Sequence, residues 1–417
     1  MSFSEFFRAF ARIGLLSFGG PAAQIALMHR ELVDERKWLT EAEFLRALSF
    51  CMMLPGPEAM QLATYAGWKL RGVVGGIIAG LLFVLPGAAV IAALALLYLS
   101  FGDQPLVRAA FVGVKAAVIA IVLEALLRIS KRALKGRLHT VLAAAAFVAL
   151  AMFHLRFPLV IVIAGLIGAL AAPQTDAAAL PAPAPGRALR VAAIAGALWA
   201  APLLAAKATG ATFLTEIGVF FSKLAVVTFG GAYAVLAYMA QDVVTGRGWL
   251  TPLQMVDALG LAETTPGPLI LVTQFVAMLA GDAQGGIPLA LLAGAMTLWV
   301  TFVPCFLWIF AGAPYIDWLA GKPRLSAALS GITAAVVGVI LNLSLWFALH
   351  VGFRSVGEAT LGPIHLPLPD PASADRLAIL LAVLASYLLL LRHWGLGKVL
   401  ALSAALGLVL GGWGGLA

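Results

Sequence analysis

Long apolar runs separated by short polar loops dominate the chain. Residues 73–99 and 157–172 contain no charged side chain, and runs of similar character follow one another along the sequence. About twenty apolar residues form a helix long enough to cross the hydrocarbon core of a bilayer. The pattern therefore predicts about thirteen transmembrane segments, which begin near Phe3, Phe44, Val73, Leu106, Leu138, Phe157, Leu189, Thr215, Met255, Gly286, Leu325, Arg376 and Leu396.

The composition supports a location in the membrane. Of the 417 residues, 62% are hydrophobic and 11% are charged, and the mean hydropathy is +1.02. A chain of this length with so few polar residues cannot cover the surface of a soluble globule. The amino-terminal segment lacks a short apolar core followed by a small-residue cleavage site, so we expect no removable signal peptide. These features predict an all-α integral membrane protein that crosses the lipid bilayer many times.

The positive residues indicate the orientation of the chain. The net charge of +8 is spread over short loops beside apolar runs and forms no single basic tract, which argues against a nucleic-acid partner. If all predicted segments cross, Lys and Arg are more numerous in the loops on the amino-terminal side. Because cytoplasmic loops carry the excess of positive residues, we expect the amino terminus in the cytoplasm.

The chain also contains an internal duplication. The motif Phe18-Gly19-Gly20 recurs as Phe229-Gly230-Gly231, and Pro55-Gly56-Pro57 recurs as Pro266-Gly267-Pro268 at the same spacing. Roughly a third of the positions in and between these motifs are identical, which indicates a common origin. We predict a first membrane repeat at 1–172, a linker with a connecting transmembrane helix at 173–214, and a second membrane repeat at 215–417.

The predicted crossings place the two repeats in opposite directions. An odd number of crossings separates their starts, so the second repeat enters the membrane from the other side. Inverted repeats of this kind are typical of secondary transporters, whose substrate site lies near mid-membrane between the repeats. If the Pro-Gly-Pro segments are instead re-entrant hairpins, both the crossing number and the relative orientation change.

The Pro-Gly-Pro motifs predict broken helices. Thr40 and Glu43 can form a capping box that begins a helix running to Leu54, where Pro55 and Pro57 stop it, and a new helix starts at Glu58 or Ala59. The start of a helix presents unpaired N–H groups and the positive end of its dipole, which suits an anion. The alternative is a plain proline kink, which the second copy at 266–268 makes less attractive.

The paired glycines of the Phe-Gly-Gly motifs interrupt two apolar helices. Gly19 and Gly20 in the first repeat, like Gly230 and Gly231 in the second, allow either a helix break or the close approach of another backbone. A direct role in substrate binding and simple close packing of helices both remain open for these four residues.

Three cations lie inside predicted membrane segments, where charge is costly and suggests function. Lys115 stands alone about mid-way along an apolar run, and its counterpart in the second repeat is Thr333. Lys223 is flanked by apolar residues on both sides, and Arg12 occupies the matching position of the first repeat. Arg12 is near the chain start, so its side chain could instead reach the membrane interface.

Several carboxylates are candidates for coupling transport to protons. Glu58 follows one Pro-Gly-Pro motif, and Glu263 precedes the other. Glu58 could equally be a charge favoured at a helix start. Glu124 is a further candidate, although Arg128 lies four residues later on the same helix face and favours a local ion pair.

Other chemistry has little support in the sequence. There is no phosphate-binding loop that ends in Gly-Lys-Ser/Thr, and the six His residues lack the paired spacing of a metalloenzyme. Cys51 and Cys305 lie in apolar surroundings and are interpreted as buried thiols. We expect no enzymatic activity, no cofactor and no metal, and an intramembrane enzyme remains the remote alternative.

Three motif runs carry a resemblance to a known family. Residues 18–29 (FGGPAAQIALMH), 32–39 (LVDERKWL) and 54–68, which begins Leu-Pro-Gly-Pro-Glu-Ala-Met-Gln61, resemble the chromate ion transporter family in its fused two-domain form. The resemblance extends to Gly113-Val114-Lys115, where the family often has Pro after the Lys and this chain has Ala116. It implies a secondary carrier of the bacterial inner membrane that exports chromate and so confers chromate resistance.

These observations together define a substrate site. We expect an antiporter that binds chromate at the repeat interface, with sulfate or another small oxyanion as the alternative substrate; a homodimer is compatible with this interpretation. The expected substrate-binding residues are Gly19, Gly20, Pro55, Gly56, Pro57, Gln61, Lys115, Lys223, Gly230, Gly231, Pro266, Gly267 and Pro268, and the proton-coupling candidates are Glu58, Glu263 and Glu124.

Overall fold

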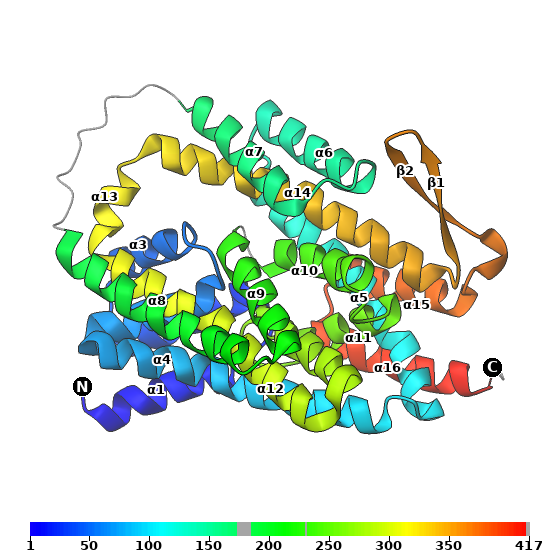
Figure 1. Ribbon diagram of the computed structural model, residues 1–417, viewed down its shortest axis with the longest axis horizontal. Coiled ribbons are helices and arrows are strands. Elements are labelled where there is room, and N and C mark those ends of the chain that lie inside the picture. Colours follow the sequence, from blue (N-terminus) through cyan, green and yellow to red (C-terminus); the bar gives the residue numbers. More distant parts are fainter. Residues whose placement is uncertain (173–184, 230–231, 414–417) are drawn as a thin grey trace. The chain divides into compact units, whose positions relative to one another are not determined.

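The computed structural model describes residues 1–172, 185–229 and 232–413, and the regular secondary structure of these residues is helical apart from one short β-hairpin (Figure 1). The described residues form two compact units, which are treated separately below. The first unit comprises residues 1–96, 172, 185–229, 232–235 and 262–326, and the second comprises residues 97–171, 236–261 and 327–413. Each unit therefore takes segments from both predicted repeats, so a repeat is not a compact body by itself.

The first unit contains the early helices of both repeats. Its elements are α1 (Phe3–Leu15), α2 (Gly20–His29), a π-helical turn (Arg30–Glu35), α3 (Glu41–Cys51), most of α4 (Glu58–Phe101), α8 (Pro185–Ala208), α9 (Thr212–Val227), the start of α10 (Ala232–Gln241), a 3-10 turn (Leu269–Leu271), α12 (Val272–Gly312), a 3-10 turn (Ala313–Tyr315) and α13 (Ile316–Ala320). Within this unit α12 packs against α8 and α9.

The second unit contains the later helices. Its elements are α5 (Pro105–Ala133), α6 (Arg137–Ala151), α7 (Phe157–Leu170), the end of α10 with its π-helical turn (Asp242–Gly246), most of α11 (Pro252–Glu263), most of α14 (Pro323–Gly352), β1 (Val356–Leu361), β2 (Ile364–Pro369), a 3-10 turn (Pro371–Ser373), α15 (Arg376–Ser386), a π-helical turn (Tyr387–Leu391) and α16 (Leu396–Trp413). Here α5 packs against α15 and α16 through small and branched residues, among them Ala117, Ile121, Ala385 and Val399.

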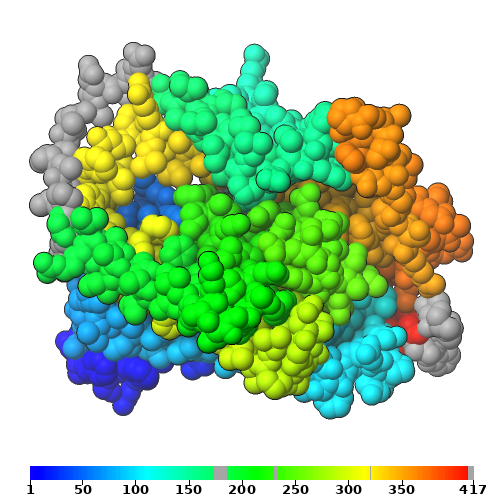
Figure 2. All heavy atoms as spheres, viewed as in Figure 1, coloured from blue at the N-terminus to red at the C-terminus, as the bar shows by residue number. Residues whose placement is uncertain are grey.

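The antiparallel β1–β2 hairpin was not expected from the apolar pattern, which predicted only helices. It pairs Val356 with Pro369 and Leu361 with Ile364 and lies between α14 and α15. In Figure 2 it stands out in orange on the molecular surface. The sequence here is mixed and includes Gly362 with a positive φ of 61°, so the strands turn tightly between two apolar helices.

The long helices α4 and α12 are each a helical hairpin. The α4 backbone leaves helical geometry at Arg71 and Gly72, where Gly72 has φ 63° and ψ −159°, and α12 does the same at Gly285 and Gly286. A side chain at Gly67 would lie 2.4 Å from the carbonyl oxygen of Gly75, so the arms 58–70 and 73–101 approach closely across the turn. The chain therefore reverses direction soon after each Pro-Gly-Pro motif.

Five helical stretches of the described residues are long and apolar enough to cross a membrane: Glu58–Phe101, Pro105–Ala133, Ala188–Ala208, Leu269–Leu319 and Pro323–Gly352. Four shorter apolar helices accompany them, at Arg137–Ala151, Phe157–Leu170, Arg376–Leu391 and Leu396–Gly411. Every predicted segment begins on or beside a helix. A multi-pass membrane protein follows, whereas the number thirteen and the inverted orientation stay predictions.

Candidate functional site

The first Pro-Gly-Pro motif breaks a helix as predicted. The capping box of α3 is present, because the Thr40 hydroxyl accepts the Glu43 N–H and the Glu43 carboxylate accepts the Thr40 N–H. The helix ends at Cys51, three residues before the expected end, and α4 starts at Glu58. The early end has a local cause, since the ring of a proline at 55 would clash with the carbonyl of a helical residue at 51.

The two Pro-Gly-Pro motifs are held by the opposite repeats. The Gly56 N–H donates to the carbonyl oxygen of Thr228 at 2.8 Å, and the Gly267 N–H donates to the carbonyl oxygen of Ser17 at 2.8 Å. Ser17 and Thr228 occupy matching positions directly before the two Phe-Gly-Gly motifs. All six residues of the Pro-Gly-Pro motifs are buried. Each loop thus satisfies a carbonyl at the end of a helix from the other half of the chain.

The same exchange extends to the second arms of the helical hairpins. A side chain at Gly87 would lie 2.2 Å from the carbonyl oxygen of Pro266, and a side chain at Gly56 would lie 2.9 Å from the Cys305 sulfur. Gly87 and Cys305 occupy matching positions of the two repeats. Cys305 is buried, as is Cys51, in agreement with the prediction of buried thiols.

Two buried glutamines hold the loops from the side. The Gln61 amide donates to the Pro55 carbonyl at 2.7 Å, and the Gln24 amide donates to the Gly267 carbonyl at 2.7 Å. Both side chains are almost fully buried. Gln24 was not among the expected site residues, although a polar amide in an apolar helix is a signal that sequence inspection can use.

These contacts limit which backbone N–H groups near the helix breaks can bind an anion. Proline has no N–H, and the N–H of each central glycine is already bonded, so the loops themselves offer no N–H for an anion. The helix that restarts at Glu58 has N–H groups in its first turn that form no intrahelical hydrogen bond, and these are the remaining candidates.

The first Phe-Gly-Gly motif forms a helix break and not a close helix contact. Gly19 and Gly20 have φ values of 82° and 78°, and no neighbouring atom lies within 4 Å of a side chain built at Gly20. The positive φ values explain the glycines, because other residues are strained there. The matching Gly230 and Gly231 lie outside the described residues.

The predicted intramembrane cations differ in their surroundings. Arg12 forms a 3.1 Å ion pair with Glu31, whose fully buried carboxylate also lies 3.3 Å from the Arg36 guanidinium. Lys223 is exposed on α9 and has no ion pair among the described residues. Arg12 is therefore occupied by a structural charge cluster, which the sequence did not indicate.

The candidate coupling carboxylates are also placed. Glu58 is half-buried at the start of α4, and Glu263 accepts a 2.8 Å hydrogen bond from the Tyr233 hydroxyl at the end of α11. Glu124 pairs with Arg128 within α5, which confirms the local ion pair considered from the spacing.

The second unit contains a buried ion pair that sequence inspection missed. The Lys115 ammonium lies 3.2 Å from a carboxylate oxygen of Asp257, and the Tyr98 hydroxyl donates to the other oxygen at 2.8 Å. The Asp257 side chain is 5% exposed and that of Lys115 is 17% exposed. Asp257 is an isolated charge in an otherwise apolar stretch of α11, and this pattern is a sequence signal from which its burial can be predicted.

Lys115 also lines a cavity of about 570 Å³ in this unit. The other polar or charged walls come from Thr251 just before α11, from His350 near the end of α14, and from Arg354 and Asp375. Thr251 caps α11, because its hydroxyl accepts the Gln254 N–H. Lys and Arg side chains that line one cavity are an arrangement that suits an oxyanion.

Apolar helices, broken at buried loops and folded back as hairpins, define a multi-pass membrane protein of the transporter class. The sequence model of the chromate transporter family matches residues 4–169 and 215–411. The chain belongs to the chromate transporter family.

Individual relatives agree with this assignment. A chromate transport protein of Pseudomonas aeruginosa is 38% identical over 82% of this chain and 80% of the relative, and one of Cupriavidus metallidurans is 33% identical over 79% of each. A transporter of Bacillus subtilis is 29% identical over 40% of this chain but 96% of its own length. No solved structure matches the chain.

Proposed function

We propose that this protein is a secondary carrier that exports chromate from the cytoplasm across the inner membrane of a bacterium and so confers chromate resistance. The ion pair of Lys115 with Asp257 at the edge of a basic cavity carries the proposal. Membership of the chromate transporter family supports the substrate.

The cavity has the chemistry to hold a tetrahedral dianion. Lys115 on α5 and Arg354 after α14 supply positive charge and hydrogen-bond donors to the cavity. Asp257 and Asp375 oppose them, so the binding of an anion depends on how much of the Lys115 charge is already neutralised.

This dependence supplies a coupling mechanism. When Asp257 takes up a proton, Lys115 loses its counter-charge and can pair with chromate, while the Tyr98 hydroxyl stays beside the carboxyl group. When the proton leaves, the carboxylate competes for Lys115 and favours release. Proton and chromate are therefore bound at the same time and cross the membrane in the same direction. Asp257 is therefore our principal coupling carboxylate, and Glu58, Glu263 and Glu124 are comparison positions.

The membrane potential supports export as the direction of transport. A membrane potential that is negative inside favours the exit of anions by about 2.3 kcal/mol per charge for each 100 mV. A dianion gains twice this amount, so the membrane potential by itself favours export.

The Pro-Gly-Pro and Phe-Gly-Gly motifs hold the broken helices in place in this proposal. Reciprocal bonding of Gly56 and Gly267 keeps the breaks in register, and the first-turn amides after 57 and 268 present donors to the substrate path. Lys223 would attract anions to that path from its exposed position on α9.

We further propose that the two repeats are inverted in the membrane. The two regions matched by the family, and a relative that one repeat nearly covers, support the duplication. The reciprocal contacts of Gly56 and Gly267 support an approximate twofold relation between the repeats within the first unit.

Sulfate is the second candidate substrate. The cavity presents positive charge and hydrogen-bond donors, and sulfate and chromate share the tetrahedral shape and double charge that such groups recognise. Chromate would then be carried incidentally.

Everted membrane vesicles test these proposals directly. An exporter should accumulate labelled chromate in such vesicles, and should do so faster when the outer medium is more acidic than the vesicle lumen, because proton and chromate enter together. Excess sulfate should inhibit strongly only if it shares the site. Lys115→Ala should abolish uptake, whereas Lys135→Ala, which changes an exposed loop lysine, should not. Uptake of chromate by the Lys115→Ala protein at the wild-type rate would remove Lys115 from the substrate site.

A further inference from the structure

Three potential metal ligands from distant parts of the sequence meet at the β-hairpin. His154 follows α6, Glu358 lies on β1 and His365 lies on β2. Their ligand atoms all lie within 4.8 Å of one another. The His365 Nδ1 atom is 2.6 Å from a carboxylate oxygen of Glu358, and the His154 Nδ1 atom is 3.9 Å from the same oxygen.

The backbone holds the three side chains together. Thr360 pairs with His365 across the hairpin, so Glu358, two residues before Thr360, projects from the same face as His365. The His365 N–H donates to the carbonyl oxygen of Met152 at 2.8 Å, which ties β2 to the segment that carries His154.

His154 itself has an unusual backbone conformation. Its φ of 48° lies in the left-handed region, which non-glycine residues seldom adopt. This conformation brings the imidazole over His365, and the two rings stack with centroids 4.5 Å apart.

We propose that His154, Glu358 and His365 form a binding site for a divalent transition metal ion, with Zn²⁺ as the best fit. Two imidazoles and one carboxylate are a known ligand set for zinc, with metal–ligand bonds of about 2.0–2.2 Å. A tetrahedral ion needs ligand atoms about 3.3 Å apart by the same bond lengths, so small rotations of exposed side chains suffice.

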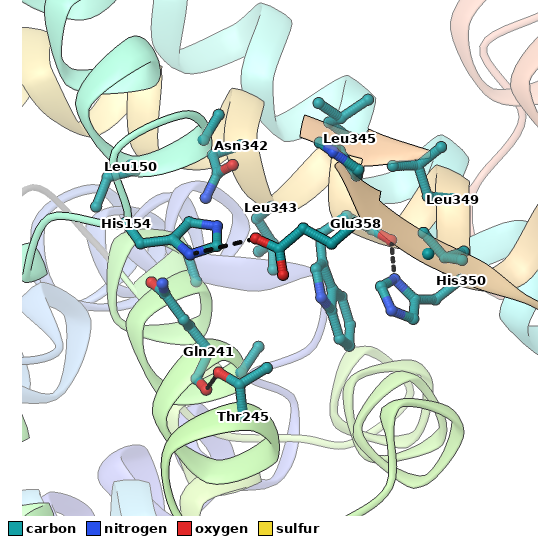
Figure 3. Close-up of a pocket in the computed structure, with 17 residues that line it drawn as sticks. Leu150, His154, Gln241, Thr245, Asn342, Leu343, Leu345, Leu349, His350 and Glu358 are labelled. Carbon is teal, nitrogen blue, oxygen red and sulfur yellow. Dashed lines mark hydrogen bonds and ion pairs between the residues drawn. The ribbon is translucent and has the colours of Figure 1, made fainter. Parts of the chain in front are cut away.

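The site would keep one coordination position open. His154 and Glu358 line a cavity of about 400 Å³, whose other polar walls include Gln241, Asn342 and His350. In Figure 3 His154 and Glu358 point toward one another among the residues that line this cavity. A fourth ligand, water or a small anion, would bind from the cavity side.

Metal analysis of the purified full-length protein in detergent tests the site. After incubation with Zn²⁺ and gel filtration, we expect about one zinc ion per wild-type chain and none above background in the His154→Ala/His365→Ala and Glu358→Ala proteins. His139→Ala, which changes a histidine on α6 outside the cluster, should retain the ion. Equal zinc content in wild type and in the double variant would overturn the proposal.

A second measurement needs no variant. In wild-type protein, Zn²⁺ should protect His154 and His365 from modification by diethyl pyrocarbonate, as read by mass spectrometry, and should leave His139 reactive. Because metal ligands must be deprotonated, protection should weaken as the pH is lowered. Equal modification of all three histidines with and without Zn²⁺ would contradict the site. Neither experiment depends on chromate transport.

Discussion

Lys115 and Asp257 form a 3.2 Å ion pair, and the two residues come from different predicted repeats of the chain. The pair is largely withdrawn from solvent, where an uncompensated charge is expensive. We therefore expect the pair to contribute both to the stability of the fold and to anion binding, and separate experiments can measure the two contributions.

The Lys115–Asp257 pair predicts a distinct pattern among variants. Lys115→Ala should lower the stability by about 3–5 kcal/mol because it leaves a buried carboxylate without a partner. Lys115→Ala/Asp257→Ala should recover most of that loss but should not transport chromate. Thermal unfolding in detergent measures the first effect, and vesicle uptake measures the second. Transport by the double variant would contradict a direct role of Lys115.

Asp257→Asn predicts a change in coupling. The neutral amide cannot bind and release a proton. Lys115 then has no carboxylate partner at this position in any protonation state, and its charge remains available to an anion. Chromate binding should persist, whereas acceleration of uptake by a proton gradient should disappear. Glu58→Gln and Glu263→Gln are the matched controls and should keep the acceleration. A proton effect that survives Asp257→Asn would assign coupling elsewhere.

The central glycines of the Pro-Gly-Pro motifs predict sensitivity to one added methyl group. At Gly56, where φ is 118°, a side chain would meet Cys305 and Gln61 at 2.9 Å. Gly56→Ala should therefore cost about 1–3 kcal/mol of stability. Gly196→Ala on α8, where nothing lies within 4 Å, should be neutral or stabilising by up to about 1 kcal/mol. Equal melting temperatures for the two variants would show that the loop tolerates crowding.

Removal of the prolines tests the substrate role of the breaks. Pro55→Ala/Pro57→Ala should let helix geometry continue, which removes the bond from Gly56 to Thr228 and withdraws first-turn amides into the helix. The chromate concentration that half-saturates uptake should rise. Pro266→Ala/Pro268→Ala tests the second repeat in the same way, and there we expect a smaller rise in the half-saturating chromate concentration. Unchanged half-saturation in both proteins would separate the breaks from the anion site.

Membrane topology tests the inverted arrangement. Reporter tags at Met1 should report the cytoplasm, and tags after Ala417 should report the periplasm. Tags in the hairpin turns at Gly72 and Gly286 should help to distinguish crossings from re-entrant arms. Both chain ends on one side of the membrane would contradict the thirteen-crossing arrangement.

Local chemistry made several features predictable from the sequence. The end of α3 near Pro55, its capping box at Thr40 and the restart at Glu58 depend on residues only a few positions apart, and the structure contains all three. The membrane class follows from composition, because the bilayer selects apolar helices whatever their packing.

Tertiary structure alone decided which residues meet. Gly56 bonds to Thr228, Lys115 pairs with Asp257, and His154 stacks on His365. The residues near each of these in the chain do not indicate which partner it has. Helices in lipid are apolar on most sides, so their periodicity does not reveal which face packs against which neighbour. Those choices arise from close backbone approach at small residues such as Gly87 and from the need to satisfy buried polar groups, and both conditions exist only once the helices are assembled.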